Sequence, residues 1–252
     1  MQRLLLIAAI SLAASAPASA HRHLELSCSV HSNYGVSLDG DGLRFEREKG
    51  SPGKVVMHAG HLRIDGRELS LSDADHRRVA EYEATVRALV PQAKIIARDA
   101  IGIAFTAVSE VAVAFSSDAN HSDVRDRLDR VRSGVLQKVD ESFDKRPWQQ
   151  SQLDDIVEST VSELVPVLVG DIAGTAIRIA LSGDEAAAKE LERRSDKLEH
   201  DIERRIDTQT EQLAARAEAL CPMVAQLASI EASLELRLDG GARLDLLSQG
   251  RD

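Results

Sequence analysis

The sequence contains two cysteines, Cys28 and Cys221, and whether they pair is the first chemical question it raises. Neither has another cysteine close to it, so the chain has no C-x-x-C redox pair and no cysteine-rich spacing of a zinc site. Two interpretations remain, a disulfide that joins distant parts of the chain or two buried free thiols. The choice between them depends on the compartment.

Residues 1–20 have the features of a cleaved signal peptide. A short positive head precedes an apolar stretch from Leu4 to about Ala14, and Ala18-Ser19-Ala20 has the small-x-small pattern of a cleavage site. The stretch is shorter than the roughly 20 residues that span a bilayer, which disfavours the alternative of a retained anchor. We therefore expect an exported, periplasmic protein. In that oxidising compartment we favour a disulfide between Cys28 and Cys221.

Cleavage after Ala20 would make His21-Arg22-His23 the mature N-terminus. The amine of His21, two deprotonated amides and the imidazole of His23 could then offer four nitrogens in one plane, an arrangement that suits Cu(II) or Ni(II). His21 and His23 are therefore the candidate metal ligands. The alternative is an ordinary solvated terminus without a metal-binding role.

Two other patterns resemble metal sites but have simpler explanations. The acidic residues between Asp39 and Glu48 echo part of a calcium loop, yet strands are expected on both sides and DGDG at 39–42 is typical of a hairpin turn. His58 and His61 have no third ligand near them in sequence, so we interpret them as surface residues.

Motifs and composition both disfavour common enzyme and binding classes. The chain has no nucleophile elbow, P-loop, H-E-x-x-H or dinucleotide fingerprint, so we expect no catalytic residues and no cofactor. A net charge of −10 argues against nucleic acid or an anionic membrane as partner. Four Phe, two Tyr and one Trp provide few platforms for stacking sugars or bases.

Residues 21–71 are expected to form a small antiparallel β-meander. Apolar and polar residues alternate from Leu24 to Leu71, and DGDG at 39–42, GSPG at 50–53 and DG at 65–66 are typical of hairpin turns. This pattern predicts five or six short strands, the first of which holds Cys28. Such a sheet is marginal alone and needs a helix against one face.

Residues 72–252 are expected to be mainly helical and to form one compact α+β domain with the meander. Ser72 has the position of an N-cap before the first helix, and Pro91 is expected to kink or restart that helix. A further helix is predicted where apolar residues recur at helical spacing from Val124 to Phe143.

The longest helix is predicted at about 184–220. Its charges pair at i, i+4, for example Asp201 with Arg205, which is typical of a solvated face. We favour a helix packed on its own domain over an intermolecular coiled coil, because Ser195 and Gln209 interrupt the apolar seam.

Two apolar stretches, 95–115 and 165–181, are interrupted by charges. We therefore expect a central pair of helices in a soluble bundle, and no membrane insertion after signal cleavage. Small residues such as Gly170 and Gly174 could let the two backbones approach closely.

The order of these segments resembles the YggN-like family of uncharacterised periplasmic proteins. The resemblance is carried by SCSV, by HLRIDGRELSLSDADHRRVAEY, by ALVPQAKIIARDAIGIA and by ALCPM near the end, and it spans most of the mature chain. It implies an exported α+β protein with a paired cysteine and no assigned activity, and it supplies no catalytic residues.

From these observations we expect a non-catalytic periplasmic protein that binds another envelope component, with its long charged helix as one candidate surface. A homo-oligomer remains open. The alternative is a periplasmic copper- or nickel-binding protein that uses His21 and His23.

Overall fold

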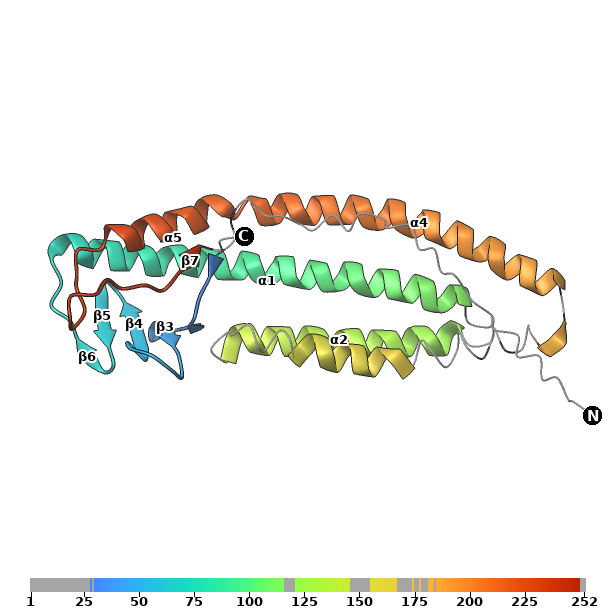
Figure 1. Cartoon of the computed structure of the whole chain (residues 1–252), viewed down its shortest axis with the longest axis horizontal. Coiled ribbons are helices and arrows are strands. Elements are labelled where there is room, and N and C mark those ends of the chain that lie inside the picture. Colours follow the sequence, from blue (N-terminus) through green and yellow to red (C-terminus); the bar gives the residue numbers. More distant parts are fainter. Residues whose placement is uncertain are drawn as a thin grey trace, which may run out of the picture.

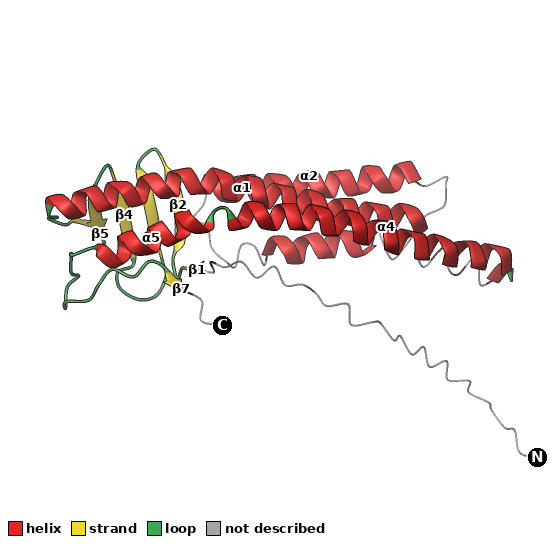
Figure 2. Cartoon of the chain, turned by 90° about the horizontal axis from the view of Figure 1, so that it is seen from above, coloured by secondary structure: helices red, strands yellow, loops and turns green. Residues whose placement is uncertain are grey.

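The structure of the chain is a computed structural model, and it has the α+β architecture that the sequence predicts. A small β-sheet lies at one end of a long helical stalk (Figures 1 and 2). The structure describes residues 28, 30–115, 121–145, 155–166, 174, 177, 181–183 and 185–249.

The five-stranded sheet is the predicted meander, with each strand antiparallel to the next in the order β2-β3-β4-β5-β6. Its strands are β2 (Gly35–Asp39), β3 (Gly42–Glu46), β4 (Lys54–His58), β5 (His61–Ile64) and β6 (Arg67–Glu68). The expected hairpin turns lie at 39–42 and 65–66, and a further turn joins β4 to β5. Alternate residues of the strands face the core, as in Val55 and Met57 of β4.

The turn between β4 and β5 rests directly on the helical part of the protein. Gly60 has a φ of +83°, and a Cβ atom there would lie 2.9 Å from the backbone oxygen of His76. Only glycine satisfies both conditions without strain. This close approach fixes the hairpin against the first helix.

That helix, α1 (Asp73–Phe115), is 43 residues long and is the longest in the described part of the chain. The predicted cap is confirmed, because the Asp75 N–H donates to Ser72 Oγ at 3.1 Å. Of the two outcomes expected at Pro91, a kink or a restart of the helix, the restart is wrong, since Pro91 lies inside α1. Packing against α2, α4 and α5 along its length offsets the backbone hydrogen bond that proline removes.

The other helices lie along α1 (Figure 2). They are α2 (His121–Lys145), α4 (Glu185–Glu218) and α5 (Cys221–Ser233), and residues 155–166 are also helical. The apolar stripe of α2 is confirmed, with Val124 and Leu128 buried against Ala112 of α1. In α4, Arg205 pairs with Glu110 of α1 instead of the predicted Asp201. Both arginines of this turn, Arg204 and Arg205, are exposed, whereas Ile202 and Ile206 of the apolar stripe are partly covered.

The described residues test only part of the prediction that 95–115 and 165–181 form a central pair of helices, because most of 167–180 lies outside them. Residues 95–115 form the second part of α1, which packs against α2 and α4. Gly170 lies outside the described residues, and a Cβ atom at Gly174 would have no heavy atom within 4 Å. Within the described ranges, no helix is both long and apolar enough to cross a membrane.

Two features of the chain's ends were not predicted. Strand β1 (Val30–His31) does not join the meander but pairs with β7 (Ser248–Gln249) in a separate two-stranded sheet. Cys28 precedes β1 and lies outside any strand, so its predicted strand position is wrong. Pairing with a segment more than 200 residues away moved this stretch out of the meander.

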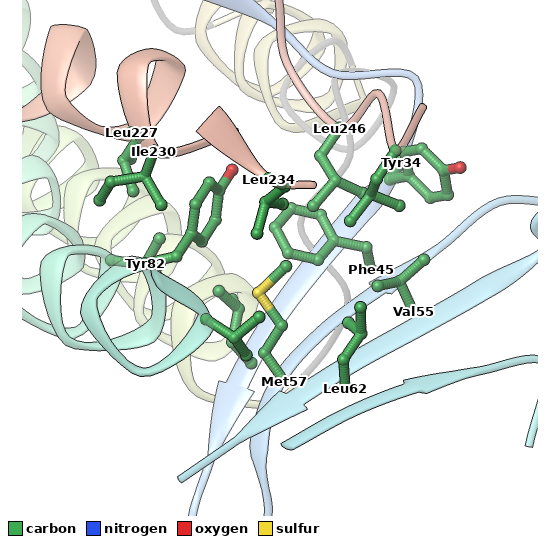
Figure 3. Close-up of a cluster of buried hydrophobic side chains, with 14 of the residues drawn as sticks. Tyr34, Phe45, Val55, Met57, Leu62, Tyr82, Leu227, Ile230, Leu234 and Leu246 are labelled. Atoms are coloured by element: carbon green, nitrogen blue, oxygen red, sulfur yellow. The ribbon is translucent and has the colours of Figure 1, made fainter. Parts of the chain in front are cut away.

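The main core joins the sheet, α1, α5 and the C-terminal segment 234–249 (Figure 3). Phe45 of the sheet lies edge-on to Tyr34 and to Tyr82, at centroid distances of 6.1 and 6.2 Å. Leu234 and Leu246 of the C-terminal segment are buried beside these rings. We call this part of the molecule the head, and the helices beyond it the stalk.

Candidate functional site

The structure places the two cysteines that were expected to pair at disulfide distance. The sulfur atoms of Cys28 and Cys221 are 1.97 Å apart and their Cα atoms are 5.4 Å apart. Cys221 is the first residue of α5, where the chain turns at 219–220 after α4. The bridge therefore connects the beginning of the described chain to the junction between stalk and head.

The predicted metal ligands His21 and His23 lie outside the described residues. The other predicted surface histidines, His58 and His61, flank the β4–β5 turn together with His76 of α1. His76 Nδ1 lies 2.9 Å from the Gly60 oxygen, and the rings of His61 and His76 are 5.4 Å apart. Within the described part of the chain, no three His, Cys, Asp or Glu residues are grouped so that they could hold a metal ion.

Three buried carboxylates hold backbone segments together within the head. Asp75 accepts hydrogen bonds from the N–H groups of Glu235 and Leu236, at 3.1 and 2.9 Å. Burial by itself would raise the pKa of Asp75, but those bonds and the one from Arg78 hold the pKa below its usual value. The two backbone bonds join α1 to the C-terminal segment, so Asp75 is a structural tie.

Glu231 of α5 ties the same segment from the other side. Its Oε1 accepts the N–H groups of Leu246 and Leu247, while Oε2 is buried without a partner. Burial raises the pKa of Glu231 against the opposing effect of those two hydrogen bonds. Burial and the neighbouring Glu231 also raise the pKa of Tyr82.

The third carboxylate, Glu83 of α1, holds the β4–β5 turn. Its Oε2 accepts the Ala59 N–H at 2.8 Å, and its Oε1 receives two hydrogen bonds from Arg87. These contacts satisfy the side chain within the fold. None of the three carboxylates has a partner arrangement that suggests acid–base chemistry.

A hollow of about 560 Å³ lies on the outer face of the sheet. Its cationic side chains are largely neutralised, because Arg44 lies 3.3 Å from Asp39 and Lys54 lies 2.7 Å from Glu46. The mixture of charges gives the hollow no clear preference for a ligand.

The most distinctive surface lies on the helical segment 155–166 of the stalk. Val157, Val161 and Val165 are 61%, 52% and 48% exposed. Because residues four apart share a face of a helix, these three side chains form one apolar stripe, which we call the valine stripe. Leu164 of the same segment packs against the cluster formed by α1 and α2. The apolar face of this segment is thus only partly covered by the rest of the described protein: Leu164 is packed, whereas the three valines are about half exposed.

Sequence reasoning missed the valine stripe as a surface. It identified 165–181 as apolar and assigned the stretch to the interior, while Val157 and Val161 received no role. The signal was present as three valines at i, i+4 and i+8 beside polar neighbours. Exposure depends on which face the other helices cover, and local spacing does not determine that.

The sequence also matches a known family model. The model described as "Protein of unknown function (DUF2884)" covers residues 28–247 of the chain. The match begins at the first bridged cysteine and ends one residue before β7, so it includes both the head and the stalk. No curated protein sequence and no solved structure matches the chain.

Proposed function

The chain belongs to the DUF2884 family of proteins of unknown function, and we propose that it is an exported, non-catalytic protein whose stalk binds another protein of the cell envelope. The observation that carries this proposal is the valine stripe. Exposed apolar side chains that gather on one helix face are typical of protein-binding surfaces. The proposed export rests on the signal-peptide features of residues 1–20.

Burial of the valine stripe would supply useful binding energy. Full burial of a valine side chain contributes about 1.5 kcal/mol or more. Since each of the three valines is about half exposed, covering them contributes about 2–3 kcal/mol. A contribution of this size is enough to orient a partner, but a stable complex also needs polar contacts around the stripe.

The flanks of the stripe indicate the chemistry of the partner. Asp155 and Glu158 are exposed on the same segment and form no ion pair with described residues. A second copy of this acidic chain would bring like charges together, which disfavours a homodimer through this face. We therefore assign the stripe to an amphipathic helix of a partner protein that carries lysine or arginine beside its apolar face.

The test uses the purified mature protein and two labelled helical peptides with the same apolar face. One peptide carries lysines beside that face and the other carries glutamates. We expect fluorescence anisotropy to show binding of the lysine peptide at least about tenfold tighter, and this difference should shrink in high salt.

The variant Val157→Ser/Val161→Ser should weaken the lysine peptide about tenfold or more, because it removes apolar area without changing charge. Ile95→Ser is the matched control, since Ile95 is 55% exposed on α1 outside the stripe. Equal binding by both variants would overturn the proposal. A concentration-dependent dimer in sedimentation, abolished by the stripe variant alone, would instead assign the surface to a second copy.

Copper or nickel binding at His21 and His23 remains the alternative role, and it rests on the sequence alone. Mass spectrometry of the secreted protein establishes whether His21 is its first residue. Copper titration of that protein, compared with a His23→Ala variant, then tests the site without involving the stalk.

A further inference from the structure

A groove of about 300 Å³ lies between α1, α2 and α4, where the three helices run side by side (Figure 2). Its lining is polar and rich in arginine, although the chain as a whole is acidic. The side chains that matter here are Arg98, Thr106, Arg132, Gln209, Gln212 and Arg216.

Two of the three arginines are already neutralised by carboxylates. Arg98 donates to Asp140 Oδ2 at 2.5 Å, and Arg216 pairs with Asp99. The third, Arg132 of α2, makes no hydrogen bond or ion pair with any described residue. Its Nη2 lies over Gly102 of α1, 3.6 Å from the position that a Cβ atom would occupy there. The guanidinium thus reaches into the groove with its donors unused.

A second unused group comes from α4. The Oε1 atom of Gln209 is buried and has no hydrogen-bond partner. A buried acceptor without a donor is costly, so it indicates a position where a ligand could supply one. The groove therefore presents free donors on Arg132 and a free acceptor on Gln209.

We propose that this groove binds a small oxyanion that also carries a hydroxyl group, such as a hydrogenphosphate or a phosphate monoester. The anionic oxygens accept hydrogen bonds from Arg132, whose planar fork matches phosphate geometry. The ligand's O–H donates to Gln209 Oε1. Since the contacts come from α2 and α4 on either side of α1, the bound anion joins helices that the chain otherwise connects through long segments.

Calorimetry with three anions at constant ionic strength tests both contacts. Inorganic phosphate and glycerol 3-phosphate carry an O–H, whereas sulfate at neutral pH does not. We expect the phosphates to bind about tenfold or more tightly than sulfate, because only they satisfy Gln209. The tighter of the two phosphates indicates whether the ligand is free phosphate or an organic ester.

Arg132→Gln should weaken phosphate binding about tenfold or more, and Arg132→Lys should weaken it less, because it keeps the charge and loses the fork. Arg130→Gln is the matched control on the same helix, since the Arg130 Nε donates to the Asp126 carbonyl of its own helix. It should leave binding within about twofold. Circular dichroism establishes that the three variants fold.

Three results would overturn the proposal. The first is that neither phosphate binds at millimolar concentration. The second is that sulfate binds as tightly as phosphate, which would exclude the contact to Gln209. The third is that Arg130→Gln weakens binding as much as Arg132→Gln, which would indicate nonspecific ionic attraction. None of these variants touches the valine stripe, so their results are independent of the proposed function.

Discussion

Replacing Asp75 with alanine should lower the free energy of unfolding by about 3 kcal/mol at neutral pH. The substitution leaves the backbone N–H groups of Glu235 and Leu236 without their acceptor. A buried donor without a partner costs about 1–3 kcal/mol, and two such donors account for the expected loss. The ion pair with Arg78, at 2.9 Å, is lost as well.

Asp73→Ala is the matched control, because Asp73 lies in the same first turn of α1 but is exposed. It loses only the interaction of a carboxylate with the helix dipole, about 0.3–1 kcal/mol. The assay is urea denaturation followed by circular dichroism. The reasoning is refuted if the two variants differ from each other by less than about 1 kcal/mol.

The contribution of Asp75 should also depend on pH in a defined direction. Since the pKa of Asp75 is lowered in the folded state, the stabilisation is present above the unfolded pKa of about 3.9 and is lost as the pH falls towards the folded pKa. The difference between wild type and Asp75→Ala should therefore shrink between pH 5 and about pH 3. A difference that stays constant over this range would exclude the ionised carboxylate as its source.

Three further predictions concern the head. Because the pKa of Glu231 is raised in the folded state, its contribution to stability should fall as the pH rises above the unfolded value of about 4.3. Glu231→Gln keeps an acceptor oxygen, so urea denaturation should show no such fall for this variant relative to wild type. Reduction of the Cys28–Cys221 bridge should lower the melting temperature, and the loss in free energy of unfolding should be at most about 5 kcal/mol, the limit set by chain entropy. Two free thiols in the non-reduced protein would contradict this prediction. Gly60→Ala should destabilise by about 1–3 kcal/mol more than Gly66→Ala, because both have a positive φ but only Gly60 abuts a backbone carbonyl.

Features encoded by neighbouring residues were predicted well. Alternating residues and turn sequences indicated the meander, the position of Ser72 indicated the start of α1, and the apolar spacing from Val124 indicated α2. Each of these signals arises from contacts within one element or one hairpin, so a short stretch of sequence contains all the information.

Apart from the Cys28–Cys221 pair, features that depend on distant partners were not predicted. Pro91 remains inside α1 because neighbouring helices pack along it, and a single lost hydrogen bond does not decide where a packed helix ends. The C-terminal segment 234–249 alternates apolar and polar residues around Asp239-Gly240-Gly241, but its place against the core is set by Asp75, Glu231 and pairing with β1. Its contribution to the core is visible only when the chain is folded.

The sequence by itself determined the α+β class, the hairpins of the meander and the presence of two cysteines that could pair. Only the tertiary structure decided that Val157 and Val161 remain exposed, and that Arg132 and Gln209 face one groove. The physical reason is that helical spacing defines which residues share a face, whereas the packing of other helices decides whether that face is covered. A groove between three helices has no local signature, because its lining comes from segments far apart in the chain.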